Sequence, residues 1–223
     1  MIPAGKYIVF GRTGCGKSSF INTLANKNLA KTDDFNACTN QLKEYSFNTP
    51  DGNFKIIDTP GFCEDEDPNT DRRFLNLIKS FLENDIPDTD INSEYKILLF
   101  CKFGEKRIRT EDHLIINYFV KLICDLKDLN ININSSLIST FANFNLNKSE
   151  FNRLFQMTRL RYLTLIDLYE KKRASNKLYI SQTENKEEPF IWNIFNFSNC
   201  YAVDNMSGFF TSNWSKIEIF PEN

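Results

Sequence analysis

The sequence predicts a three-layer α/β fold with a mostly parallel, doubly wound sheet and one antiparallel edge strand. Short apolar runs typical of strands alternate with helical patterns, and a glycine-rich turn joins the first strand to the first helix. A turn with Pro and Gly at residues 49–53 joins two further strands into a hairpin, which accounts for the antiparallel edge. With 223 residues, the chain is long enough for one such domain and too short for two ordinary ones.

The predicted strands are short runs of β-branched, aromatic or aliphatic residues. They cover residues 6–10, 41–47, 54–57, 97–100, 137–141 and 190–197. Between them, apolar residues recur at helical spacing over 18–25, 72–82, 111–126 and 149–172. Residues 181–188 are polar and predict a loop, and residues 213–216 would only begin a closing helix. We therefore expect a single domain over 1–223 that lacks a full C-terminal helix.

Composition and charge exclude several classes of protein. Hydrophobic residues make up 41% of the chain and charged residues 25%, as in ordinary globular proteins. The net charge is only -2, so we expect neither nucleic acid nor an anionic membrane as a partner. Six cysteines without a CxxC pair, and one histidine, indicate reduced thiols rather than a zinc site. We expect a cytoplasmic location without a direct membrane anchor, because no apolar run reaches about 18 residues and neither end carries a lipidation signal.

The glycine-rich turn at residues 11–18 reads Gly-Arg-Thr-Gly-Cys-Gly-Lys-Ser and fits the phosphate-binding pattern GxxxxGK[ST]. It follows a strand and opens a helix, so its backbone N–H groups and the helix dipole would face a nucleotide's phosphates. Lys17 would bridge the β- and γ-phosphates, and the Ser18 hydroxyl would bind Mg²⁺. The predicted nucleotide-binding residues of this segment are Arg12, Thr13, Gly14, Cys15, Gly16, Lys17, Ser18 and Ser19.

A second motif, Asp-Thr-Pro-Gly at residues 58–61, follows an apolar strand about 40 residues after the first. Asp58 would hold Mg²⁺ through a water, and the Gly61 N–H would approach the γ-phosphate. Between the motifs, Thr39 stands just before a strand, where a switch threonine closes over Mg²⁺ and the γ-phosphate; Thr32 is the alternative. The predicted metal ligands are thus Ser18, Thr39 and Asp58, and the pairing of motifs favours a GTPase.

Position 62 is Phe, where many small GTPases carry the glutamine that orients the attacking water. Intrinsic hydrolysis should therefore be slow. The acidic run at residues 64–67 is expected to be a solvated second switch rather than a catalytic group.

Together, GRTGCGKSS, the threonine before a strand, DTPGF, and LLF followed by Gly104 and RIRTED at 107–112 resemble a known family. This is the family of immunity-associated nucleotide-binding GTPases (GIMAP-like or AIG-type), from the septin-like and chloroplast-import-receptor group. The resemblance covers about residues 6–144, although residues 105–106 interrupt the family's box G-R-[FY]-T-x-E-D. It implies a G domain, and association across the nucleotide face, with Arg107 or Arg109 reaching the phosphates of a neighbouring subunit in a homodimer.

The resemblance also implies that a T-x-K-D-like sequence reads the guanine base. Residues 140–143 are instead Thr-Phe-Ala-Asn, so the lysine is missing and Asn143 offers a single carbonyl oxygen. Guanine selectivity should be weakened. Asn-Lys-Ser-Glu at 147–150 is a competing candidate, which also fits a helix start with a capping serine. Further base contacts are expected from Ser198 and Asn199, with residues 204–205 or a plain loop as alternatives.

Two functions compete on this sequence. The first is a slow GTPase switch that binds GTP or GDP with Mg²⁺ and acts through its GTP-bound shape. The second is a pseudo-GTPase, which binds nucleotide without turnover; Phe62 and the altered residues 140–143 favour it. An enzyme that uses ATP ranks third.

Overall fold

The computed structural model describes residues 5–25, 27–30, 41–49, 52–63, 67–85, 95–105, 107–128, 133–140, 147–184, 200–203 and 218–219. Its strands are β1 (Gly5–Phe10), β2 (Lys43–Thr49), β3 (Gly52–Asp58), β4 (Tyr95–Lys102), β5 (Ile133–Thr140), β6 (Cys200–Val203) and β7 (Glu218–Ile219). Its helices are α1 (Lys17–Ala25), α2 (Pro68–Asp85), α3 (Thr110–Asp128) and α4 (Lys148–Glu184). The described strands form one sheet in the order β2-β3-β1-β4-β5-β6-β7, so the predicted α/β fold is confirmed.

The sheet is mostly parallel. Strands β3, β1, β4, β5 and β6 run in one direction, and β2 pairs antiparallel with β3, as the hairpin pattern predicts. A second antiparallel strand, β7, pairs with β6 at the other edge, and the sequence did not predict it. Strand β1 lies inside the sheet between β3 and β4, so the loop after it opens at the end of the sheet where ligands bind in such folds.

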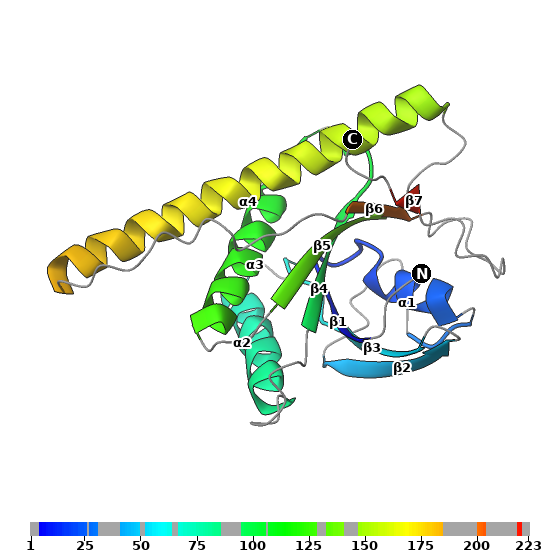
Figure 1. Ribbon diagram of the computed structural model, residues 1–223, viewed down its shortest axis with the longest axis horizontal. Helices are drawn as coiled ribbons and strands as arrows, with labels where there is room; N and C mark the ends of the chain where they lie inside the picture. The colour runs from blue at the N-terminus through cyan, green and yellow to red at the C-terminus, as the bar shows by residue number, and fades with distance from the viewer. Residues whose placement is uncertain are drawn as a thin grey trace.

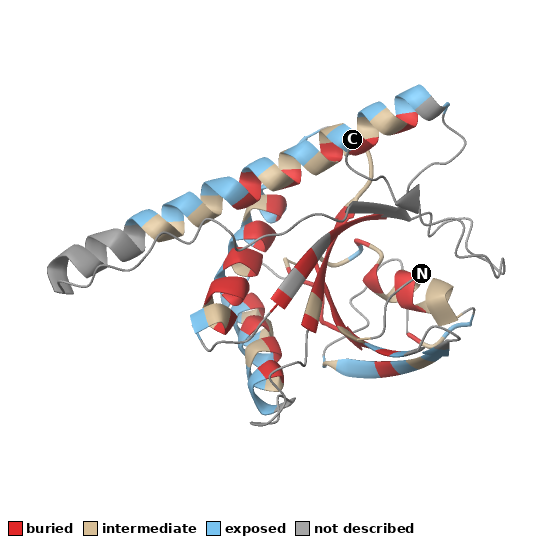
Figure 2. Ribbon diagram, viewed as in Figure 1, coloured by how far each residue is buried: buried red, intermediate tan, exposed pale blue. Residues whose placement is uncertain are grey.

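Helices cover both faces of this sheet. Helix α1 lies on one face, and α2, α3 and the start of α4 lie on the other (Figure 1). Along β4 the side chains alternate: Leu98 and Phe100 pack on the α1 side, whereas Ile97 and Leu99 pack on the α2–α3 side. Figure 2 shows the buried residues concentrated in the central strands and on the inner faces of the helices.

Helix α4 is longer than the sequence predicted. It continues through residues 181–184, which were expected to begin a loop, because no Gly or Pro interrupts the chain between residues 147 and 188. With 37 residues it is about 55 Å long, and Figure 1 shows its far end extending past α3. Its middle is held on α3 by Arg173, which pairs with Asp125 at 2.6 Å, and by Tyr169, whose hydroxyl lies 3.3 Å from His113 Nδ1.

The end of the chain differs from the prediction in one further respect. The strand that pairs with β5 is β6, at Cys200–Val203, and the strand predicted at 190–197 lies outside the described residues, as does the start of a closing helix at 213–216. None of the helices within the described ranges has the combination of length and apolarity needed to cross a membrane.

Candidate nucleotide site

The glycine-rich loop connects the end of β1 to the start of α1. At Gly14 the backbone has φ 71°, a left-handed conformation that favours glycine. Lys17 is buried, and its Nζ donates hydrogen bonds to the carbonyl oxygens of Gly11 and Arg12, both at 3.0 Å. The Thr140 hydroxyl at the end of β5 lies 2.6 Å from the Cys15 carbonyl oxygen and fixes the loop from below. The Lys17 side chain therefore folds back over its own loop, which is the segment expected to bind the phosphates of a nucleotide.

Ser18 and Asp58 lie together, as the motifs predict. The Ser18 hydroxyl donates to Asp58 Oδ2 at 2.9 Å, across 40 residues of sequence. Asp58 ends β3 and is only 1% exposed, so its carboxylate is held in place. Carboxylate and hydroxyl oxygens suit Mg²⁺, which keeps several waters and takes its other ligands from phosphate. Within the described ranges, no group of three or more His, Cys, Asp or Glu side chains is placed to hold a metal ion by itself.

The segment after Asp58 is joined to the glycine-rich loop by its backbone. Phe62 N–H donates to the Gly11 carbonyl at 3.3 Å, and Thr13 N–H donates to the Phe62 carbonyl at 3.0 Å. Gly61 lies against Thr13 so closely that a Cβ at this position would be 2.0 Å from Thr13 Oγ1. Gly61 is thus required here by its packing on Thr13, and the approach of its N–H to the γ-phosphate stays a prediction.

Phe62 is a core residue. It is fully buried, and its ring centroid lies 4.6 Å from that of Phe10, 5.8 Å from Tyr118 and 6.4 Å from Phe74. The side chain at this position therefore points into the layer between β1, α2 and α3. It does not occupy a place from which it could orient a water at the phosphates.

The predicted arginine box forms the connection between β4 and α3. Asp112 is buried and accepts two hydrogen bonds, from the Arg109 N–H at 2.9 Å and from the Tyr162 hydroxyl at 2.8 Å, so it caps α3. Arg109 is 58% exposed and lies 3.4 Å from Glu105, which also pairs with Arg12 of the loop. The structure thus brings Arg109 beside the nucleotide loop. Arg107 is exposed.

The surroundings of the loop keep Arg12 charged and the nearby cysteines protonated. Burial alone would lower the pKa of Arg12, but the negative charges of Glu105 and Asp112 raise it above its usual value. Burial and the neighbouring Asp71 raise the pKa of Cys63 to about 12. Burial also raises the pKa of Cys15. Both cysteines beside the loop are therefore thiols at neutral pH and are poor nucleophiles.

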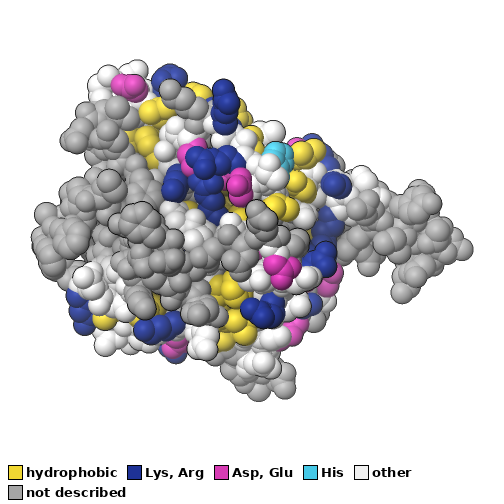
Figure 3. All heavy atoms as spheres, turned by 180° about the vertical axis from the view of Figure 1, so that it is seen from behind, with side chains coloured by type: hydrophobic (Ala, Val, Ile, Leu, Met, Phe, Trp, Pro, Cys, Tyr) yellow, Lys and Arg dark blue, Asp and Glu magenta, His cyan; other side chains and the backbone are white. Residues whose placement is uncertain are grey.

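Charged surface side chains gather near the start of α3. Figure 3 shows basic and acidic side chains clustered beside the chain's single histidine, which is His113 on the first turns of that helix. The described ion pairs of this region join Glu105 to Arg12 and to Arg109.

Several predicted site residues lie outside the described residues. They are Thr32, Thr39, Asn143, Ser198, Asn199 and the alternative at 204–205. The competing base motif at 147–150 starts α4: Asn147 Oδ1 accepts the Glu150 N–H at 2.9 Å, so the capping residue is Asn147 rather than the predicted Ser149. Likewise Asp67, the last residue of the acidic run, caps α2 by accepting the Asn69 N–H at 2.9 Å.

Sequence reasoning missed two residues of the site. In the sequence, Glu105 only interrupts the box. Asn22 on α1 holds the chain just before residues 31–40: its Oδ1 accepts the N–H groups of Leu29 and Ala30, at 2.8 and 2.7 Å. The neighbours of Asn22 one turn earlier on α1, Ser18 and Ser19, are polar as well, so no pattern in the sequence singles it out. No local pattern marks Glu105.

The sheet order, the glycine-rich loop and the Ser18–Asp58 pair define a P-loop GTPase. The family model "50S ribosome-binding GTPase" matches residues 6–133, more than half of the chain. The chain belongs to this family. It is a GTP-binding GTPase domain.

Relatives of known name match only in part. GTP-binding protein A of Dictyostelium discoideum is 27% identical over 136 residues, which cover 61% of this chain and 28% of that protein. Translocase of chloroplast 108 of Physcomitrium patens is 30% identical over 82 residues, which cover 36% of this chain and 8% of that protein. The matched part of the chain therefore spans less than a third of either relative.

Solved structures confirm the fold. Toc33 from Arabidopsis thaliana in complex with GDP and Mg²⁺ superposes with a TM-score of 0.59 at 18% identity, over 96% of this chain and 76% of that one. A second structure, which reports that dimerization is important for the GTPase activity of the chloroplast translocon components atToc33 and psToc159, gives a TM-score of 0.60 at 19% identity. It covers 99% of this chain and 76% of that one.

Proposed function

We propose that the chain binds GTP or GDP with Mg²⁺ and acts as a switch with slow intrinsic hydrolysis. The observation that carries this proposal is the combination of an intact phosphate and metal site with a buried Phe62. Lys17 would leave its carbonyl partners to donate to the β- and γ-phosphates, and Ser18 and Asp58 would hold Mg²⁺. When bound, the ion neutralises charge on the phosphates. Position 62 supplies no group to orient water.

A second copy of the chain would supply the missing charge. Arg109 supports this step because its guanidinium is exposed and lies beside the loop, with Arg107 as the alternative. Dimerization is important for GTPase activity in the Toc33 and Toc159 structure described above. An arginine aimed at the transferring phosphoryl group is worth about 10³–10⁵ in rate. We also propose the AIG-type subfamily, a single domain over 1–223 and a cytoplasmic location.

The test is turnover per site as a function of protein concentration, for the wild type, Arg107→Ala and Arg109→Ala. We expect the rate per site to climb with concentration and to collapse in Arg109→Ala. Collapse in Arg107→Ala instead would move the role to that residue. A rate that stays flat and ignores both substitutions would exclude catalysis in trans.

The alternative is a pseudo-GTPase, favoured by Phe62 and by the absence of the base-reading lysine at residues 140–143. Identifying the nucleotide that copurifies with the protein, and measuring its turnover, separates the two. Retained GTP without phosphate release supports the alternative. In either case, Lys17→Ala should abolish binding in calorimetry with GTP and a non-hydrolysable analogue, and unchanged affinity would refute the site itself.

A further inference from the structure

Glu105 lies where three elements meet. It stands in the connection between β4 and α3, and its side chain is only 18% exposed although it is charged. Its carboxylate forms an ion pair with Arg12 of the P-loop and lies 3.4 Å from Arg109. Its backbone carbonyl accepts a hydrogen bond from the guanidinium of Arg161 on α4. One residue therefore contacts the P-loop, the box arginine and the long helix.

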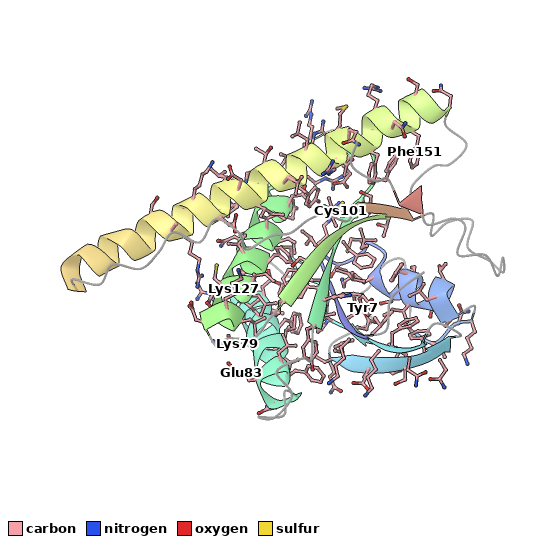
Figure 4. All side chains as sticks on the ribbon, in the orientation of Figure 1. Tyr7, Lys79, Glu83, Cys101, Lys127 and Phe151 are labelled. Atoms are coloured by element: carbon pink, nitrogen blue, oxygen red, sulfur yellow. The ribbon has the colours of Figure 1, made fainter. Side chains whose placement is uncertain are left out.

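Helix α4 holds the same connection at further points. The Gly104 N–H donates to Thr158 Oγ1 at 3.3 Å. Phe103 stacks on Phe151, with ring centroids 5.0 Å apart, and Figure 4 shows Phe151 on the first turns of α4. The α4 residues involved are Phe151, Thr158 and Arg161, whose spacing of seven and three places them along one face of the helix. The connection is therefore fixed to α4 over about three helical turns.

At the other end of Glu105, Arg12 is sensitive to what the P-loop binds. Its carbonyl oxygen accepts a hydrogen bond from Lys17 Nζ at 3.0 Å, and this lysine is the group that would turn to a phosphate. Its side chain is only 12% exposed, and a charge so enclosed is destabilised if it loses its partner. If the backbone at Arg12 shifts, Glu105 has to move with it to keep the ion pair.

We infer that Glu105 is a positioning residue of the nucleotide site, which holds Arg12 against α4 so that occupancy of the phosphate site changes the exchange behaviour of α4. The inference rests on the proposed nucleotide binding and adds the element that would report it. On this inference, α4 is the helix through which the switch signals that nucleotide is bound.

Hydrogen–deuterium exchange of the full chain tests this, with Mg²⁺ and either GDP or a non-hydrolysable GTP analogue. Exchange is followed in the P-loop, residues 11–18, and in α4, residues 151–165. The variants are Glu105→Gln, and Arg161→Gln, which breaks the link from the α4 side and keeps the Arg12–Glu105 pair. Glu111→Gln is the matched control, since Glu111 is an exposed acid on the first turn of α3.

In the wild type and in Glu111→Gln, nucleotide should slow exchange in both segments, in α4 by about fivefold or more, the lower end of typical couplings between sites. In Glu105→Gln, protection of the P-loop should remain and the response of α4 should be lost. In Arg161→Gln the response of α4 should be weakened but not abolished, because Thr158 and Phe151 still hold the connection to α4. A response of α4 that equals the wild-type response in both variants overturns the inference. The inference is also overturned if the variants exchange faster than the wild type in α4 by the same factor with and without nucleotide. That result would show a merely structural role.

Loss of P-loop protection in the wild type has a different meaning. It would overturn nucleotide binding itself, and with it the proposed function, rather than the link through Glu105. If Glu105→Gln does not fold, Arg161→Gln alone decides.

Discussion

Replacing Phe62 by glutamine restores the residue type that many small GTPases carry, and the structure predicts that this will damage the protein without speeding hydrolysis. The ring is fully buried among Phe10, Phe74 and Tyr118. An aromatic side chain buries about 200 Å², which at about 25 cal/mol per Å² corresponds to about 5 kcal/mol. Glutamine keeps part of that apolar area but leaves an amide without partners in an aromatic cluster.

The expected loss in unfolding free energy for Phe62→Gln is therefore about 4 kcal/mol, within the range of about 3–5 kcal/mol seen when large aromatics are removed from cores. Because domains are stable by only about 5–15 kcal/mol, the loss should be plain in urea denaturation followed by far-UV circular dichroism. The matched control is Leu77→Gln on α2, which is 41% exposed and should cost less than about 1 kcal/mol.

The same preparations are assayed for GTP hydrolysis by phosphate release under conditions where both variants are folded. The rate in Phe62→Gln should not exceed that of the wild type, because the side chain at position 62 faces the core. A Phe62→Gln variant that has the same urea unfolding midpoint as the wild type and hydrolyses GTP markedly faster would refute this account of position 62. It would show that the residue faces the phosphates during the reaction.

Further predictions concern the metal, a half-buried carboxyl and a thiol. In Ser18→Ala and Asp58→Asn, nucleotide affinity should fall in Mg²⁺ and change little in EDTA, as measured by calorimetry; equal losses in both buffers would contradict the metal role. Burial, reinforced by a neighbouring carboxylate, raises the pKa of Glu170 to about 7, so the folded state holds a proton that the unfolded state releases near pH 4.5. Unfolding free energy should therefore fall between about pH 5 and about pH 8, and Glu170→Gln should remove that part of the pH dependence; an unchanged profile would count against it. Because the pKa of Cys63 is about 12 rather than 9.0, its alkylation by iodoacetamide near neutral pH should be about a thousandfold slower than that of an ordinary thiol, and Asp71→Asn should speed it. Mass spectrometry of the labelled peptide measures this, and rapid labelling of the folded wild type would disprove it.

What the sequence could predict was local. The P-loop and the Asp-Thr-Pro-Gly segment are contiguous motifs whose residue types and flanking elements define their geometry, and the Ser18–Asp58 contact follows from sheet order. The direction of the Phe62 side chain could not be predicted, because it depends on packing between distant elements and not on a local motif. A loop residue can face either the ligand or the core, and only the packing of α2 and α3 decides which.

Contacts between distant segments were also beyond prediction. Arg12 and Glu105 are 93 positions apart, and neither lies in a pattern that names the other. The end of α4 was placed too early because polar residues suggested a loop, whereas the absence of Gly and Pro lets a helix continue. Strand β6 is apolar but only four residues long, and the longer apolar run before it, at 190–197, attracted the prediction instead.

The pairing of Arg12 with Phe62 bears on the entropy of ligand binding. The two residues form a parallel bridge, so the P-loop is fastened to the neighbouring segment by main-chain hydrogen bonds before any phosphate arrives. Fixing the backbone of a free residue costs about 1–2 kcal/mol, and a loop that is already ordered avoids this cost on binding. The aromatic cluster beneath Phe62 therefore acts at a distance from the phosphates. By keeping the bridge closed, it would preorganise the P-loop for phosphate, and residues that never touch the nucleotide would set part of its affinity.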